Sequence, residues 1–136
     1  MAGQETLSRL LAEGIAAAPA GASPLDAVAA GLERASSAMG SMNRDLAARL
    51  KAAIAASEEL QQRDALKGVS LAAAMTAALV AWGVPDPIAA LAGELGVLAF
   101  KRGYADWSAS EDTGDELAPY ALAALVELRA ATTSLS

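Results

Sequence analysis

The chain has 136 residues, a formal net charge of −6 and 54% apolar residues, and it contains neither cysteine nor histidine. One domain fits this length, and the missing residues exclude disulfides, thiol nucleophiles, Ser-His-Asp triads and the common zinc and haem ligand sets. The acidic balance also argues against these residues binding a nucleic acid backbone. Alanine and leucine are abundant while aromatic residues make up 4%, so the composition predicts an all-α fold.

Turn and cap signals divide the chain into six predicted helices. Charged residues interrupt any apolar run at the N-terminus, so no signal peptide is indicated there. Pro19 and Gly21 end the first helix, and Ser23 caps the second, with Pro24 at its first position. The predicted helices cover residues 4–18, 24–39, 44–57, 59–82, 87–108 and 115–133.

The later helices follow from the same signals. Asn43 can cap the third helix, Gly83 ends the fourth, and Asp86 is the expected N-cap of the fifth, with Pro87 at its first position. The fourth helix includes most of the longest uncharged window, residues 68–85, which approaches the length of a membrane span. Because this window is rich in alanine and ends in a Gly-Val-Pro turn, we expect a buried helix of a soluble protein.

The fifth predicted helix is apolar on two opposite faces. One face carries the large aliphatic side chains of Ile88, Leu91, Leu95 and Leu98. On or beside the opposite face lie Ala89, Gly93, Gly96, Val97, Phe100, Gly103, Tyr104 and Trp107. A surface helix needs only one apolar stripe, so we expect one face to pack on its own domain and the other on a partner subunit or a ligand.

The sixth predicted helix resembles the fifth in this respect, since Leu122 and Val126 lie off its main apolar stripe. The sequence therefore predicts a homodimer formed through residues 86–133. An alternative is a monomer with these two helices at the centre of a large core. The residues expected at the dimer interface are Ala89, Gly93, Gly96, Leu117, Ala121, Leu125 and Leu128.

An acidic cluster precedes the sixth helix. It comprises Asp106, Glu111, Asp112, Asp115 and Glu116. The spacing of a calcium-binding EF-hand loop is absent, and carboxylates are favourable near a helix N-terminus. A solvated turn explains the cluster, and the sequence indicates no metal and no cofactor.

Several short stretches, in this helix order, carry a family resemblance. They are ETLSRLLAEG at 5–14, SPLDA at 23–27, NRD at 43–45 with RL at 49–50, RD at 63–64, and DP at 86–87 ahead of the Trp107 segment. Together they resemble the C-terminal regulatory domain of TetR-like transcriptional regulators over nearly the whole chain. The order and the lengths of the helices contribute more to the resemblance than any single motif.

The resemblance implies a single regulatory domain over residues 1–136. Its first helix, residues 1–18, would link to a helix-turn-helix domain that these residues do not include, so a fragment of a longer cytoplasmic regulator is expected. In many family members the final helix pair forms a four-helix dimer interface. A small apolar or amphipathic effector would shift the helices and move the attached DNA-binding heads. DNA would be contacted only through the missing domain, and no membrane partner is expected.

The family's effector pocket lies among the middle helices, which implies a candidate ligand-binding set of Met39, Met42, Met75, Leu79, Phe100, Tyr104 and Trp107. For the methionines, ordinary core packing is the alternative. Arg44, Arg49 and Lys51 could meet an anionic effector or form a solvated helix face.

Two other classes of function compete with a regulator. An enzyme would depend on residues such as Lys67 or Glu94, but no reactive partner is indicated for either, so no catalysis is predicted. A helical scaffold or adaptor without a small-molecule ligand is the stronger alternative. An apolar cavity would favour the regulator, whereas a fully packed bundle would favour the scaffold.

Overall fold

The computed structural model describes residues 2–39, 44–110 and 116–135, and every element in these ranges is an α-helix. The helices are α1 (Ala2–Ala16), α2 (Pro24–Ala38), α3 (Arg44–Ala55), α4 (Glu58–Ala81), α5 (Asp86–Ala109) and α6 (Leu117–Thr132). The prediction of an all-α bundle of about six helices is confirmed.

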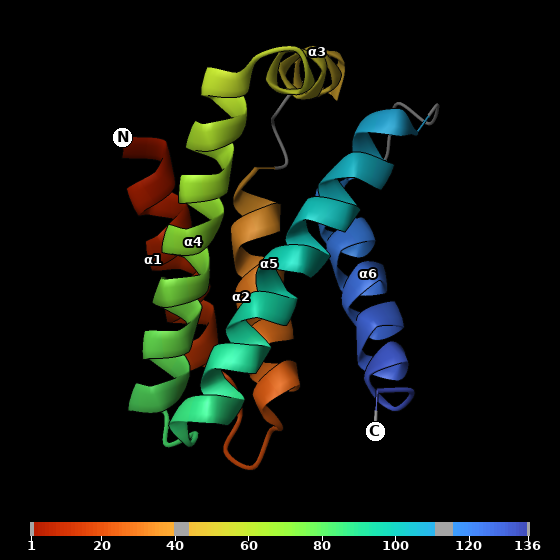
Figure 1. Ribbon diagram of the computed structural model, residues 1–136. Coiled ribbons are helices and arrows are strands. Elements are labelled where there is room, and N and C mark those ends of the chain that lie inside the picture. Colours follow the sequence, from red (N-terminus) through yellow and green to blue (C-terminus); the bar gives the residue numbers. More distant parts are fainter. Residues whose placement is uncertain (1, 40–43, 111–115, 136) are drawn as a thin grey trace.

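Five of the helices run along the bundle and one lies across its end. Figure 1 shows α1 beside α4, with α2 at the centre and α5 crossing in front of α2 towards α6. Helix α5 packs against both α4 and α6, and α1 packs against both α2 and α4. The short α3 lies across the upper ends of α4 and α5, so it covers one end of the bundle.

Side-chain caps begin α2 and α4. The Ser23 hydroxyl accepts a hydrogen bond from the Asp26 backbone N–H at 3.1 Å, as the sequence predicts, and Ser57 accepts one from Leu60 at 3.3 Å. The predicted cap of α5 is wrong. Pro85 occupies the N-cap position, while Asp86 is the first helical residue and makes no capping hydrogen bond. The Asp86 carboxylate instead lies in the first turn, where the helix dipole favours negative charge.

Close approach of α1 and α2 depends on a pair of glycines. A Cβ atom added at Gly14 would lie 2.5 Å from the Cα atom of Gly31, and one added at Gly31 would lie 2.7 Å from the Leu11 carbonyl oxygen. Any side chain at either position would therefore push the two backbones apart. This contact sets the close packing of α1 on α2.

The buried side chains form a large core and a small one. The large core draws on α1, α2, α4, α5 and α6, and it includes the fully buried Leu32, Met75 and Leu79. The small core consists of Ala47 from α3 with Trp107 and Leu117. Ala47 is the only buried residue among positions 46–55 of α3, so few buried contacts hold this helix in place.

An ion pair joins α6 to the start of α2. The Arg129 guanidinium donates to an Asp26 carboxylate oxygen at 2.8 Å. This hydrogen bond, together with that from Ser23, lowers the pKa of Asp26. Because both side chains are more than half exposed, the pair contributes little stability and serves mainly to orient the two helices.

Helix α4 is buried on one side only, whereas we expected a buried helix. It is long and apolar enough to span a membrane, yet only 28% of its most apolar 18-residue window is buried. Leu66 and Val69 are 67% and 66% exposed, and Val80 is 44% exposed. The reason is geometric: the neighbours α1 and α5 cover the face with Leu71, Met75 and Leu79, and no other element in the described residues covers the opposite face.

Candidate functional site

The candidate effector residues fall into two separate groups. Met75 and Leu79 lie in the large core with no exposed surface. Trp107 is buried in the small core, where Tyr104 packs beside it. Met39 and Phe100 are half-buried and contact both cores. Met42 lies outside the described residues.

An aromatic cluster forms beneath α3 from one side of α5. The Phe100 and Tyr104 rings lie 6.5 Å apart between centroids, and the Tyr104 and Trp107 rings meet edge to face at 5.8 Å. The Tyr104 hydroxyl reaches across to α3, where it lies 3.5 Å from the Ala47 carbonyl oxygen. Edge-to-face pairs of this kind stabilise a fixed arrangement. Displacing α3 would expose one side of this cluster.

Tyr104 combines an apolar environment with a nearby negative charge. Burial raises the pKa of its phenol above the ordinary value of 10, and the Asp64 carboxylate on α4 raises it further. The side chain therefore remains protonated at neutral pH and keeps its hydroxyl as a hydrogen-bond donor. A bound molecule with an acceptor group could use this donor in place of the long contact to Ala47.

The sequence analysis did not identify a buried polar side chain near the C-terminal end of α2. The Ser36 side chain is 1% exposed, and its hydroxyl has no hydrogen-bond partner in the part of the chain that the structure describes. An unpaired buried hydroxyl costs about 1–3 kcal/mol. Ser36 lies one turn before Met39 on α2. Its spacing of four residues from Leu32 and eight from Val28 places it on the buried face of α2, a periodicity signal that could have found it.

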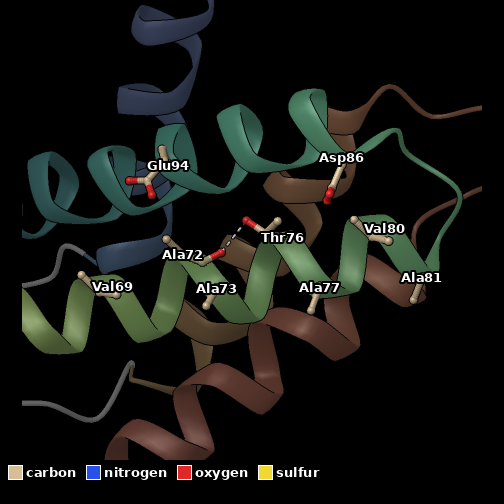
Figure 2. Close-up of a pocket in the computed structure, with 9 residues that line it drawn as sticks. All are labelled: Val69, Ala72, Ala73, Thr76, Ala77, Val80, Ala81, Asp86 and Glu94. Carbon is tan, nitrogen blue, oxygen red and sulfur yellow. Dashed lines mark hydrogen bonds between the residues drawn. The ribbon is translucent and has the colours of Figure 1, made fainter.

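Two of the open grooves in the described part of the chain lie apart from the aromatic cluster, and neither is lined by a candidate effector residue. The larger, the α4–α5 groove, has a volume of about 630 Å³ (Figure 2). It is lined by Val69, Ala72, Ala73, Thr76, Ala77, Val80, Ala81, Asp86 and Glu94. The smaller, of about 250 Å³, is lined by residues of α2, α5 and α6 around Leu25, Leu91 and Arg129.

The residues expected at the dimer interface lie inside the chain's own packing. Ala89, Gly93, Gly96, Leu117, Ala121 and Leu125 are buried by neighbours of the same chain, and Leu128 is half-buried against the large core. A Cβ at Gly93, for example, would lie 2.6 Å from the Thr76 hydroxyl of α4. These faces are already occupied, so a second copy would have to use other surfaces of α5 and α6. The cause on α5 is the small size of Ala89, Gly93 and Gly96, which allows neighbouring helices to approach α5 closely.

The opposite face of α5 is the one left open. Ile88 is 51% exposed, Leu91 60% and Leu98 44%, while Leu95 is half-buried between them. Val126 on α6 is 68% exposed. Helix α5 thus has two apolar faces, as expected. The face with the small and aromatic residues packs into the chain's own cores, and the face with the large aliphatic residues is exposed. We call Ile88, Leu91, Leu95 and Leu98 the α5 aliphatic stripe.

Potential catalytic groups are scattered. Glu94 is exposed at the edge of the α4–α5 groove, and Lys67 is half-buried on α4. Within residues 2–39, 44–110 and 116–135, no group of three or more acidic side chains is arranged to hold a metal ion. Most of the acidic cluster before α6 lies outside these ranges. No family model and no curated protein matches the chain.

Proposed function

We propose that the chain is the effector-binding and homodimerisation domain of a TetR-like transcriptional regulator. It would relay the binding of a small molecule through α1 to a DNA-binding domain attached ahead of that helix. The α5 aliphatic stripe is the observation that carries the proposal. Three large aliphatic side chains at 44–60% exposure on one helix face are a surface that gains stability when covered.

A twofold axis beside α5 and α6 would cover this stripe. Two such helix pairs form a four-helix interface, in which both copies contribute the same surface patch. Val126 supplies an exposed apolar side chain on α6. The Arg102–Glu127 ion pair, at 3.8 Å, links α5 to α6 and provides a polar rim.

Glutamate in the α5 aliphatic stripe is expected to convert a dimer into a monomer. Leu91→Glu and Leu98→Glu each place a charge where the partner's apolar side chains would pack. Dimer formation would then bury a carboxylate that has no counter-charge, which is unfavourable. Light scattering coupled to size exclusion at micromolar concentration measures the mass. Leu50→Glu on α3 is the matched control, because Leu50 is 46% exposed and Leu98 44%. A monomeric unaltered protein, or equal masses for all three variants, would reject this dimer.

The effector half of the proposal is supported by the end of the bundle beneath α3. There the aromatic cluster and half-buried Met39 supply adaptable apolar surface, and the unpaired Ser36 hydroxyl lies three residues before Met39 on α2. A ligand entering there would shift α3 and α4. Helix α1 packs against α4, so such a shift would reach the helix to which a DNA-binding domain would be joined.

The scaffold alternative remains a candidate because both described grooves avoid the aromatic cluster. The unpaired Ser36 hydroxyl has a consequence for stability under either function. Ser36→Ala is expected to stabilise the protein by about 1 kcal/mol in urea unfolding, since it removes an unpaired buried hydroxyl. Ser37→Ala, at the exposed neighbouring position, shares the change in helix propensity and serves as the control.

Nile red, a neutral apolar dye with a carbonyl acceptor, distinguishes the regulator from the scaffold. For the regulator we expect saturable Nile red binding that Ser36→Ala weakens and Ser37→Ala leaves unchanged. Absence of saturable binding to the unaltered protein would favour the scaffold. Binding that is insensitive to Ser36→Ala would place the dye site elsewhere and reject the role given to this hydroxyl.

A further inference from the structure

The α4–α5 groove lies beside the α5 aliphatic stripe and is not lined by any residue of that stripe or of the aromatic cluster. We propose that it docks an amphipathic helix of a partner protein that carries basic side chains along one edge. The groove has an apolar floor, a length that matches a short helix, and a rim of negative charge. This proposal does not depend on the proposed regulatory function.

The floor of the groove has the shape of a helix-packing surface. Its α4 residues recur every three or four positions, from Val69 through Ala73 and Thr76 to Val80, and so lie on one helix face. Most of them are alanines, which let a third helix approach closely. The Thr76 hydroxyl donates to the Ala72 carbonyl at 2.8 Å, so the one polar side chain on the α4 side is already hydrogen-bonded within its own helix (Figure 2).

The dimensions favour a helix over a small molecule. Val69 and Ala81 at the two ends are twelve residues apart, which corresponds to about 18 Å of helix or three turns. Val69 is 66% exposed and Val80 44% exposed, so apolar surface is open at both ends. Small-molecule sites usually enclose most of their ligand, whereas this groove is open along its length.

The charge of the rim specifies the occupant. Asp86 and Glu94 both project from α5 towards α4, and no lysine or arginine lines the groove (Figure 2). Neither carboxylate belongs to an ion pair within the described residues. Their eight-residue spacing corresponds to about 12 Å along the helix axis. A docked helix with basic residues two turns apart would pair with both, whereas the same groove of a second copy would oppose acid to acid.

A designed peptide tests the proposal directly. The probe is a fluorescein-labelled helix of about four turns, with alanine and leucine on one face and lysines two turns apart at its edge. A control peptide has the same composition in scrambled order, so it keeps the charge and loses the amphipathic face. In fluorescence anisotropy we expect the probe to bind at least tenfold more tightly than the control.

Charge reversal locates the binding. Glu94→Lys is expected to weaken the probe at least fivefold, while Glu33→Lys, an equal change at an exposed site on α2, leaves it within twofold. Circular dichroism checks that both variants remain folded. Equal binding of the two peptides, or no effect of Glu94→Lys, would overturn the proposal.

The other possible occupants of this face give different results. Loss of self-association on Ala73→Glu, an exposed groove position on α4 away from the α5 aliphatic stripe, would assign the groove to a second copy in sedimentation and overturn the proposal. Co-sedimentation of the protein with phosphatidylcholine vesicles, abolished by Val69→Glu, would assign this face to lipid and overturn it as well.

Discussion

Replacing Gly103 with alanine is expected to destabilise the protein by about 1–3 kcal/mol, although alanine is the better helix former. A Cβ atom at this position would lie 2.5 Å from the Cα atom and 2.6 Å from the backbone nitrogen of Ala121. Both are backbone atoms, so no side-chain rotation relieves the overlap. Helix α6 would have to move away from α5, and this movement would open the surrounding core.

The same substitution at Gly68 provides the control. A Cβ atom there would lie 3.0 Å from Nζ of Lys101, the end of a flexible and exposed side chain that can move aside. Gly68→Ala therefore keeps the gain in helix propensity, and we expect it to stabilise the protein by about 0.5–1 kcal/mol. Urea unfolding followed by circular dichroism gives both values. Equal effects for the two variants would contradict a tight α5–α6 contact at Gly103.

The sequence predicts the helices well because their signals are local. The Ser23 cap and the break after Trp82 depend on short-range hydrogen bonding and backbone conformation, and both are present in the structure. Gly83 has a φ of 107°, the left-handed conformation that favours glycine at a helix end. The prediction that Asp86 caps α5 was wrong because an Asp-Pro pair is compatible with a helix that starts at either of the two residues. Only the local backbone distinguishes them.

The site was harder to predict because it depends on which face of each helix is covered. Periodicity shows that α5 has two apolar faces but not which one lies inward. The structure selects the face with Gly93, Gly96 and Gly103, since helices approach most closely where Cβ atoms are absent. The expected interface therefore became part of the core, and the α5 aliphatic stripe became the open surface. Similarly, α4 has too few neighbours to be buried all round.

The position of Met75 in the large core, rather than in an effector pocket, predicts a large loss of stability on its truncation. This side chain has no exposed surface, and its sulfur lies 2.8 Å from where a Cβ atom at Gly96 would be. Met75→Ala is expected to destabilise the protein by about 2–5 kcal/mol because it leaves a cavity in the large core. If Met75 were instead the wall of a loosely filled pocket, the loss of stability would be much smaller.

The double variant shows whether the space at Met75 and Gly96 is shared. Gly96→Ala alone should cost about 1–3 kcal/mol, because the new methyl group meets Met75 and the Val28 side chain at 2.9 Å. With Met75→Ala present, that methyl group has room on one side. The loss of unfolding free energy in the double variant should therefore be about 1 kcal/mol smaller than the sum of the two single losses. Urea unfolding of the four proteins measures the difference.

Met75→Ala combined with Gly103→Ala is the matched control for this cycle. Position 103 is seven residues from Gly96, about 10 Å along α5, and its close neighbours are in α6 rather than α4. The two losses should therefore add within about 0.5 kcal/mol. Additivity in both pairs would show that Met75 does not pack against Gly96, and would return Met75 to the set of candidate effector contacts. Coupling confined to the Met75–Gly96 pair would place Met75 in the core, which leaves Met39, Ser36 and the aromatic cluster of Phe100, Tyr104 and Trp107 for an effector to contact.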